Sequence, residues 1–219
     1  SGLCVFNYTG GRGVVHTFGR HALPMVWDFA ESNPFNPEAA SWVSGVEDVP
    51  AGLRDADISN WAVVQRGSAT GLSYENESVD AVITDPPYYD NVPYADISDF
   101  FYVWLRRTVG HLYPEHFASD VTPKKAEAVA EPTRHGGSKG KAREVYEAMM
   151  AQSFSEAGRV LKTGGQLTVV YAHKTTLGWS TLVDALRRAG FIVTEAWPLD
   201  TEKPGRLRAQ ESAALASSI

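Results

Sequence analysis

Four consecutive residues, Asp85-Pro86-Pro87-Tyr88, bring together groups that suit the binding of a flat ring carrying an amino group. The two prolines fix their φ angles and remove two backbone donors, so acceptors dominate this corner of the chain. An exocyclic amine can donate one hydrogen bond to the Asp85 carboxylate and one to the Pro86 carbonyl, while the Tyr88 ring stacks on the flat ring that carries the amine. Asp-Pro-Pro also occurs as an ordinary turn, and that alternative predicts no chemistry here.

This corner resembles that of the amino-methyltransferases, which methylate the amino group of adenine or cytosine with S-adenosylmethionine. The amine is a weak nucleophile because its lone pair is delocalised into the ring. Hydrogen bonds to Asp85 and to the Pro86 carbonyl would localise that pair toward the methyl sulfonium, and the remaining work is positioning. The proton can leave after methyl transfer, so Asp85 need not be a strong general base. The resemblance implies four catalytic residues, with Asp85 also beside the cofactor and Tyr88 against a flipped base: Asp85, Pro86, Pro87 and Tyr88.

A strand has to present this corner. Residues 79–84 form the apolar run before it, of the kind that becomes a buried parallel strand. Strand and helix patterns alternate, which predicts an open, mostly parallel sheet with right-handed crossovers. Ligands bind beyond the carboxyl ends of such strands, so we expect Asp85 and His173, which each follow a strand, to line one rim. The expected strands are 61–66, 79–84, 166–171, 191–197 and one from 213; the expected helices are 14–32, 94–109, 142–161 (stopped by Thr163-Gly164-Gly165) and 179–189; the expected loops are 33–60 and 110–141.

Composition and charge limit the classes of protein to which the chain can belong. Its 219 residues, 43% of them hydrophobic, suffice for one core, and we expect a single domain over residues 1–219. Cys4 is the only cysteine, so no disulfide forms within the chain, and no metal site is expected. We find no membrane span and no signal peptide, so we expect a cytoplasmic protein that contacts no membrane. The net charge of −6 means that nucleic acid would have to bind a local patch.

A longer string, DPPYYDNVPYADISDFFYVWL at residues 85–105, resembles the large adenine-specific DNA methylases of bacteria and archaea, some of which carry a zinc ribbon. Stretches at 17–31, 134–137 and 206–210 resemble the same family. The resemblance implies S-adenosylmethionine as cofactor and the exocyclic amine of adenine in DNA as substrate. It implies an α/β, Rossmann-like methyltransferase fold, mostly parallel with an antiparallel last strand, and incomplete because the family's glycine cofactor loop lies upstream. This chain would then be the carboxyl portion of the catalytic domain of a longer polypeptide.

Two segments are candidates for contacts with the cofactor. Ser68 and Ala69 stand where related enzymes contact the cofactor adenine, although Ser68 replaces the acid that is common there; an ordinary exit from a strand is the alternative. Residues 9–13, Thr-Gly-Gly-Arg-Gly, are the candidate for a cofactor loop, with Glu31 as the later acid. A glycine hairpin before a helix is the alternative for that segment.

Three residues that follow the corner are candidates for binding the substrate. Tyr89, Asn91 and Tyr94 continue an aromatic and polar stretch, and we expect contacts with the edge of the target base. Packing or turn formation is the alternative for each of them. The aromatic residues at 100–104 have helical spacing, and we expect them to pack on the sheet rather than to stack on bases.

The segment 120–143 is locally basic, with six cations against two glutamates. We expect Lys124, Lys125 and Arg134 to contact DNA phosphates, which would make binding depend on salt. A solvated surface loop is the alternative, although structureless loops of this length tend to be functional.

Two other functions compete with DNA methylation. One is methylation of an RNA base, since similar corners occur in enzymes that modify guanine. The other is a catalytically silent methyltransferase-like fold that binds nucleic acid or a partner, and the missing cofactor loop favours it.

Overall fold

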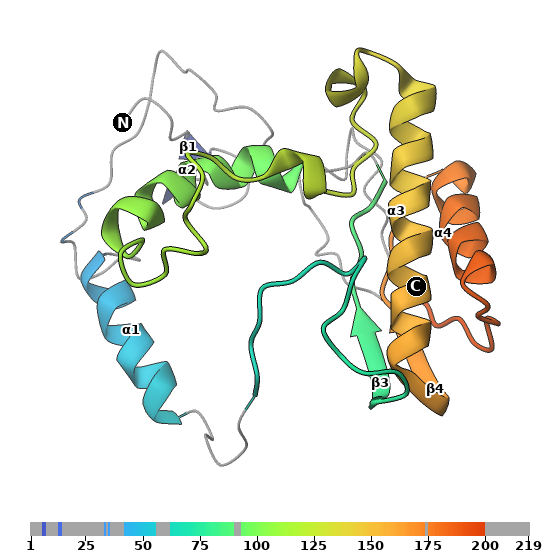
Figure 1. The fold of residues 1–219 in the computed structure, drawn as a ribbon. Helices are drawn as coiled ribbons and strands as arrows, with labels where there is room; N and C mark the ends of the chain where they lie inside the picture. The colour runs from blue at the N-terminus through green and yellow to red at the C-terminus, as the bar shows by residue number, and fades with distance from the viewer. Residues whose placement is uncertain are drawn as a thin grey trace. The chain divides into compact units, whose positions relative to one another are not determined.

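The computed structural model describes residues 6–7, 13–14, 33, 35, 42–55, 62–89, 93–173 and 175–199 (Figure 1). The chain divides into two compact units, Ser1–Arg66 and Gly67–Ile219, each with its own internal contacts. The expectation of one domain over residues 1–219 stays a prediction.

The first unit contains a short antiparallel pair of strands. β1 (Phe6–Asn7) pairs with β2 (Gly13–Val14), and Phe6 lies opposite Val14. This antiparallel pairing is the one that the glycine-hairpin alternative expects on either side of residues 9–13, and the role of that segment toward a cofactor stays a prediction. Residues 8–12 and the rest of the helix expected over 14–32 lie outside the described residues.

A helix stands inside the stretch 33–60, where we expected a loop. α1 (Trp42–Asp55) carries its large apolar side chains at 42, 46, 49 and 53, a helical spacing. These side chains are exposed, with Trp42 65% and Leu53 69% accessible. The loop prediction was wrong here because it followed the many prolines, glycines and acids of the stretch and not this periodicity. Pro50 is accommodated within the helix.

A two-stranded parallel sheet lies in the second unit. β3 (Val79–Thr84) confirms the predicted strand, and it pairs with β4 (Leu161–Val169). Val82 lies opposite Leu167 and Thr84 opposite Val169. The carboxyl ends of both strands therefore meet at the same edge of the sheet.

β4 begins five residues before the predicted start at 166. A register shift between Val79 and Ala81 accommodates Gly164, whose φ is +82°, and Gly165. A Cβ at Gly165 would come within 3.0 Å of the Asp80 carbonyl oxygen, so this position requires glycine. These glycines were expected to stop the preceding helix, but they lie in a bulge within the strand instead.

Two other strand predictions are wrong for the described residues. Residues 62–66 and 191–197 have no strand pairing, and Val64 and Ile192 are 93% and 86% exposed. An apolar run forms a strand only where a neighbouring strand supplies hydrogen bonds. Neither run pairs with a strand in the described part of the chain. The strand expected from residue 213 lies outside the described residues.

Three helices of the second unit confirm the predicted elements: α2 (Tyr94–Thr108), α3 (Lys139–Val160) and α4 (Thr176–Arg188). Side chains cap two of them, since Ser138 accepts a hydrogen bond from the Lys141 amide and Thr175 accepts one from the Gly178 amide. The expected long loop before α3 contains two short 3₁₀ turns, Lys124–Ala126 and Pro132–His135.

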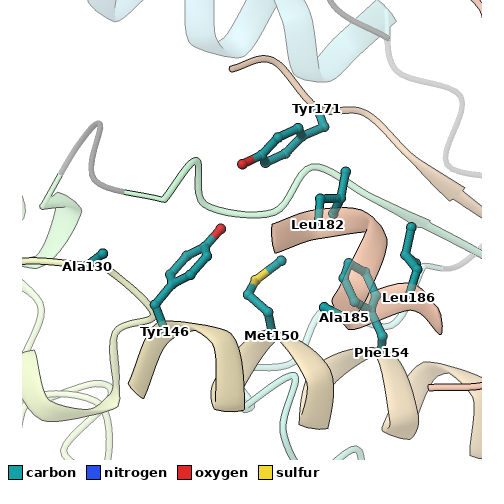
Figure 2. Close-up of a cluster of buried hydrophobic side chains, with 8 residues drawn as sticks. All are labelled: Ala130, Tyr146, Met150, Phe154, Tyr171, Leu182, Ala185 and Leu186. Atoms are coloured by element: carbon teal, nitrogen blue, oxygen red, sulfur yellow. The ribbon is translucent and has the colours of Figure 1, made fainter. Parts of the chain in front are cut away.

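The core lies between α3 and α4, which run side by side (Figure 1). Three α3 side chains, Tyr146, Met150 and Phe154, belong to this cluster; Figure 2 shows Met150 and Phe154 on the side of α3 where α4 lies and Tyr146 directed toward Tyr171. Their spacing of four residues places them on one face of the helix. The buried cluster is completed by Ala130, Tyr171, Leu182, Ala185 and Leu186.

The two faces of the sheet differ. Leu167 and Val169 pack against the α3–α4 core, whereas Ala81 and Ile83 on the alternate positions of β3 are exposed, Ile83 by 77%. Parallel sheets are normally covered on both faces. In the described residues the fold is therefore a mixed α/β arrangement of four helices with a small parallel sheet that is covered on one face.

The aromatic residues of α2 do not pack on the sheet as we expected. Phe100, Phe101 and Trp104 are 44%, 49% and 55% exposed. The helix packs through its other side, which contacts the segment 117–124 by residues at helical spacing: Ala95, Asp99, Tyr102 and Arg106. Periodicity found the helix but could not tell which of its sides is covered. None of the helices in the described residues has both the length and the apolar character needed to cross a membrane.

Candidate functional site

The corner Asp85-Pro86-Pro87-Tyr88 follows directly after β3 (Figure 1). Asp85 is exposed, Pro86 is buried, and Pro87 and Tyr88 are half-buried. The Tyr88 hydroxyl donates a hydrogen bond of 2.6 Å to Asp85 Oδ1, which fixes the orientation of the carboxylate. The corner therefore presents an anchored carboxylate at the surface on a rigid, proline-fixed turn.

The chain that leaves β4 forms the other side of this rim. The Val170 amide donates to the Thr84 carbonyl at 2.9 Å, which continues the sheet to its edge. Tyr171, 1% exposed, packs edge-on against Tyr88 with ring centroids 5.2 Å apart. The ring centroids of His173 and Tyr89, the residue after the corner, are 5.9 Å apart. The expectation that the corner and His173 lie along one rim is therefore confirmed.

His173 is 7% exposed and serves the start of α4. Its Nδ1 accepts a hydrogen bond from the Thr175 amide at 3.1 Å, and its carbonyl accepts one from Trp179 Nε1 at 2.8 Å. A Cβ at Gly178 would lie 2.1 Å from the same Nδ1, so only glycine fits against the imidazole ring. His173 is thus a structural residue of the rim.

Sequence reasoning missed two tyrosines of the site. Tyr146 of α3 donates a hydrogen bond of 2.7 Å to the Pro87 carbonyl, and Tyr171 supports the Tyr88 ring. Tyr171 is the last residue of the strand predicted over 166–171, and this position next to the expected rim is a usable signal. Tyr146 gives no such signal, because it lies 59 residues from Pro87 along the sequence.

Ser68 and Ala69 lie in a separate exposed turn, in which the Ser68 hydroxyl is 2.7 Å from that of Thr70. Gln152 of α3 holds this turn by donating to the Thr70 carbonyl at 3.0 Å. Gln152 is about 9 Å along the helix axis from Tyr146, at about 1.5 Å per residue. The described contacts do not bring Ser68 and Ala69 to the corner, and their role toward a cofactor stays a prediction.

The substrate-binding candidates after the corner are placed in part. Tyr89 is half-buried beside Tyr146, whereas Tyr94 is 57% exposed at the start of α2. Asn91 lies outside the described residues. The segment 127–130 contacts the chain near both tyrosines. The Ala130 amide donates a hydrogen bond to the Tyr89 carbonyl, and the Glu127 carboxylate accepts one from the amide of Ala95, the residue after Tyr94.

The expected phosphate-binding loop is held against α2 by ion pairs. Arg134 contacts Glu127 and Asp96, both at 2.6 Å, and Lys124 contacts Asp99 at 2.6 Å. The segment is a loop with two short 3₁₀ turns, as predicted over 110–141, and these ion pairs anchor it to α2. The ion pairs neutralise two of the cations assigned to phosphate contact, while Lys125 is exposed. Binding of phosphate by these three residues stays a prediction.

The ion pair of Lys124 gives a prediction for stability against pH. Burial raises the pKa of Asp99, but hydrogen bonds from Lys124 and Thr122 outweigh it and leave that pKa below its usual value. A lowered folded-state pKa contributes stability above the unfolded-state pKa, and this stability is lost as pH falls through the folded-state value. We expect Lys124→Met to lower the free energy of unfolding by about 1 kcal/mol or less at pH 7.

This difference between wild type and Lys124→Met should shrink in urea titrations as pH falls through the carboxyl range. Lys125→Met, at the exposed neighbouring lysine, is the matched control and should leave stability unchanged at every pH. A difference that stays constant with pH would contradict the role assigned to Asp99.

Within the described residues, no group of three or more histidine, cysteine, aspartate or glutamate side chains is arranged to hold a metal ion. No protein-family model, no curated protein and no solved structure matches this chain.

Proposed function

We propose that this chain carries the amine-binding corner of an S-adenosylmethionine-dependent methyltransferase that acts on the exocyclic amine of adenine in DNA. The observation that supports this most directly is an exposed Asp85 at the carboxyl end of β3, with its carboxylate held by the Tyr88 hydroxyl at 2.6 Å. Open α/β sheets bind ligands at this edge. The choice of adenine and of DNA is supported by the resemblance of residues 85–105 to adenine-specific DNA methylases.

The corner has the acceptors that the reaction requires. A carboxylate accepts about four hydrogen bonds, so Asp85 can receive a proton of the amine while it keeps the bond from Tyr88. In the transfer, the amine nitrogen forms a bond to the methyl carbon as the sulfonium–methyl bond breaks and its electron pair returns to sulfur. The amine then loses one proton to Asp85 or to water. Asp85 acts chiefly by orienting the lone pair before this step.

S-adenosylmethionine supplies the methyl group when it is bound. We propose that the remainder of a longer polypeptide completes its pocket. The open face of the sheet at Ala81 and Ile83 supports this, because a two-stranded parallel sheet with an exposed apolar face calls for further strands or helices. The completed domain would be a Rossmann-like, mostly parallel sheet with an antiparallel last strand, working on DNA in the cytoplasm.

Titration with S-adenosylmethionine in a calorimeter is the first test. Saturable binding to this chain alone would mean that its own residues complete the pocket and would overturn the need for a further segment. Binding only when the chain is part of the longer polypeptide is the expected result.

Tritium transfer from labelled S-adenosylmethionine to oligonucleotides tests the substrate. We expect label in DNA that contains adenine and none in the same DNA with every adenine already methylated on its amine. Preferential labelling of the matching RNA would overturn the assignment to DNA. Oligonucleotide binding without transfer, unaffected by Asp85→Ala, would overturn catalysis and favour a silent binding fold.

Tyr88 offers a separate prediction because its ring and its hydroxyl have different functions. Tyr88→Phe keeps the ring beside Tyr171, so transfer should fall by less than about tenfold, through loss of one hydrogen bond to Asp85. Tyr88→Ala removes stacking worth about 1–3 kcal/mol per base, so KM for DNA should rise roughly 5- to 150-fold. Fluorescence of 2-aminopurine at the target position reports the flipped base. Equal losses in the two variants would contradict stacking by Tyr88.

A further inference from the structure

Tyr146 makes two hydrogen bonds to the turn that carries the candidate corner. Its hydroxyl donates to the Pro87 carbonyl at 2.7 Å and accepts from the Tyr89 amide at 3.1 Å. Tyr146 is 1% exposed, and Figure 2 shows its hydroxyl directed away from α3. One buried hydroxyl therefore holds the peptide groups on both sides of Tyr88.

Tyr89 is held in a conformation that tyrosine rarely adopts. Its φ is +48°, in the left-handed region, which costs roughly 1–3 kcal/mol and persists only where the surroundings impose it. Its amide donates to the Tyr146 hydroxyl and to the Pro87 carbonyl, each at 3.1 Å, and the Ala130 amide donates to its carbonyl at 2.9 Å. The Tyr89 ring packs edge-on against Tyr146 at 5.2 Å and against His173 at 5.9 Å.

We propose that Tyr146 is a positioning residue that sets the geometry of the corner for its reaction, an inference that rests on the proposed function. Fixing the peptides before and after Tyr88 fixes where its hydroxyl lies, and that hydroxyl holds the Asp85 carboxylate. The chain of contacts runs from the α3 core through Pro87 and Tyr88 to Asp85. Misplacement of a reacting group by about 1 Å can cost about 10²-fold in rate, so this support matters for turnover more than for binding.

The test removes only the hydroxyl, by Tyr146→Phe. The first measurement is hydrogen exchange of the Tyr89 amide, which does not depend on methyl transfer. In wild type this amide should be protected, and in the variant, which keeps only the bond to the Pro87 carbonyl, it should exchange roughly 2- to 12-fold faster, as loss of one hydrogen bond implies. Amides in the middle of α4 should exchange at unchanged rates.

The second measurement is the kinetics of methyl transfer by the polypeptide that binds the cofactor. Tyr146→Phe should lower kcat by a factor no larger than that of Tyr88→Phe, less than about tenfold, and leave KM for S-adenosylmethionine unchanged. Tyr102→Phe is the matched control, because the Tyr102 hydroxyl also donates to a backbone carbonyl, that of Ser119 at 2.9 Å, on the α2 side of the unit. It should leave kcat unchanged.

The outcomes separate this inference from the proposed function. An unprotected Tyr89 amide in wild type, or one that exchanges equally fast in Tyr146→Phe, overturns the inference even if methyl transfer is found. An unprotected amide in the wild type overturns the inference even where the variant does not fold. Fast exchange with unchanged kcat also overturns positioning. Absence of transfer by the wild type overturns the proposed function and the positioning role of Tyr146 in it, whereas faster exchange of the Tyr89 amide in Tyr146→Phe would still show that the hydroxyl holds the turn.

Discussion

Asp85→Ala is expected to lower methyl transfer by about 10²- to 10⁴-fold, the range for loss of a group that handles the transferred proton and orients the reacting atom. The fold should persist because Asp85 is exposed, so its truncation opens no buried cavity. Its one described side-chain bond, from the Tyr88 hydroxyl, is worth about 1 kcal/mol. Rates with saturating DNA and cofactor, together with urea unfolding of the same preparation, separate chemistry from stability.

Two further variants define this result. Asp80→Ala removes a carboxylate that is also exposed but lies near the start of β3, at the opposite end of the strand from Asp85, where it contacts Lys162 at 2.7 Å. It should leave transfer unchanged. Asp85→Asn keeps one acceptor oxygen and should lose less activity than alanine. Wild-type rates in Asp85→Ala would refute the mechanism proposed for the corner.

Phe154→Ala is expected to lower the free energy of unfolding by about 3–5 kcal/mol. Phe154 is 3% exposed and lies in the cluster between α3 and α4, so its truncation removes buried apolar surface and leaves a cavity (Figure 2). A domain is stable by only about 5–15 kcal/mol, so the midpoint of urea unfolding should shift strongly.

Phe101→Ala is the matched control for this substitution. Phe101 is 49% exposed on α2, and its edge contact with Phe100, at 5.4 Å, is worth about 1 kcal/mol. The loss of stability should therefore stay near that value. A loss as large as that of Phe154→Ala would mean that the aromatic side of α2 is covered in solution, which would contradict the exposure described for this helix.

The parts of the fold that the sequence predicts are those set by short-range patterns. β3, α2, α3 and α4 follow from apolar runs, helical spacing and capping residues that lie within one element. The position of Asp85 at the rim follows from the same patterns, because a strand leads directly into the corner. These features need no knowledge of distant partners.

The failures have a common physical cause, which is that partners distant in sequence decide the outcome. Lys124 and Arg134 are basic in sequence, but they contact carboxylates that lie 25 and 38 residues before them. The run at 191–197 is apolar but has no adjacent strand in the described residues. Tyr146 belongs to the site only because α3 passes beneath the turn after β3, and no local pattern shows this.

The parallel pairing of β3 with β4 also has a consequence for the order of folding. Val79 and Leu161 pair across 82 residues of sequence, whereas α3 and α4 are nearly consecutive and share one core. Closing the long loop costs entropy before the sheet gains any hydrogen bonds, so the helical pair should form first and β3 should dock afterwards. The corner that follows β3 would then be among the last segments to reach its native geometry.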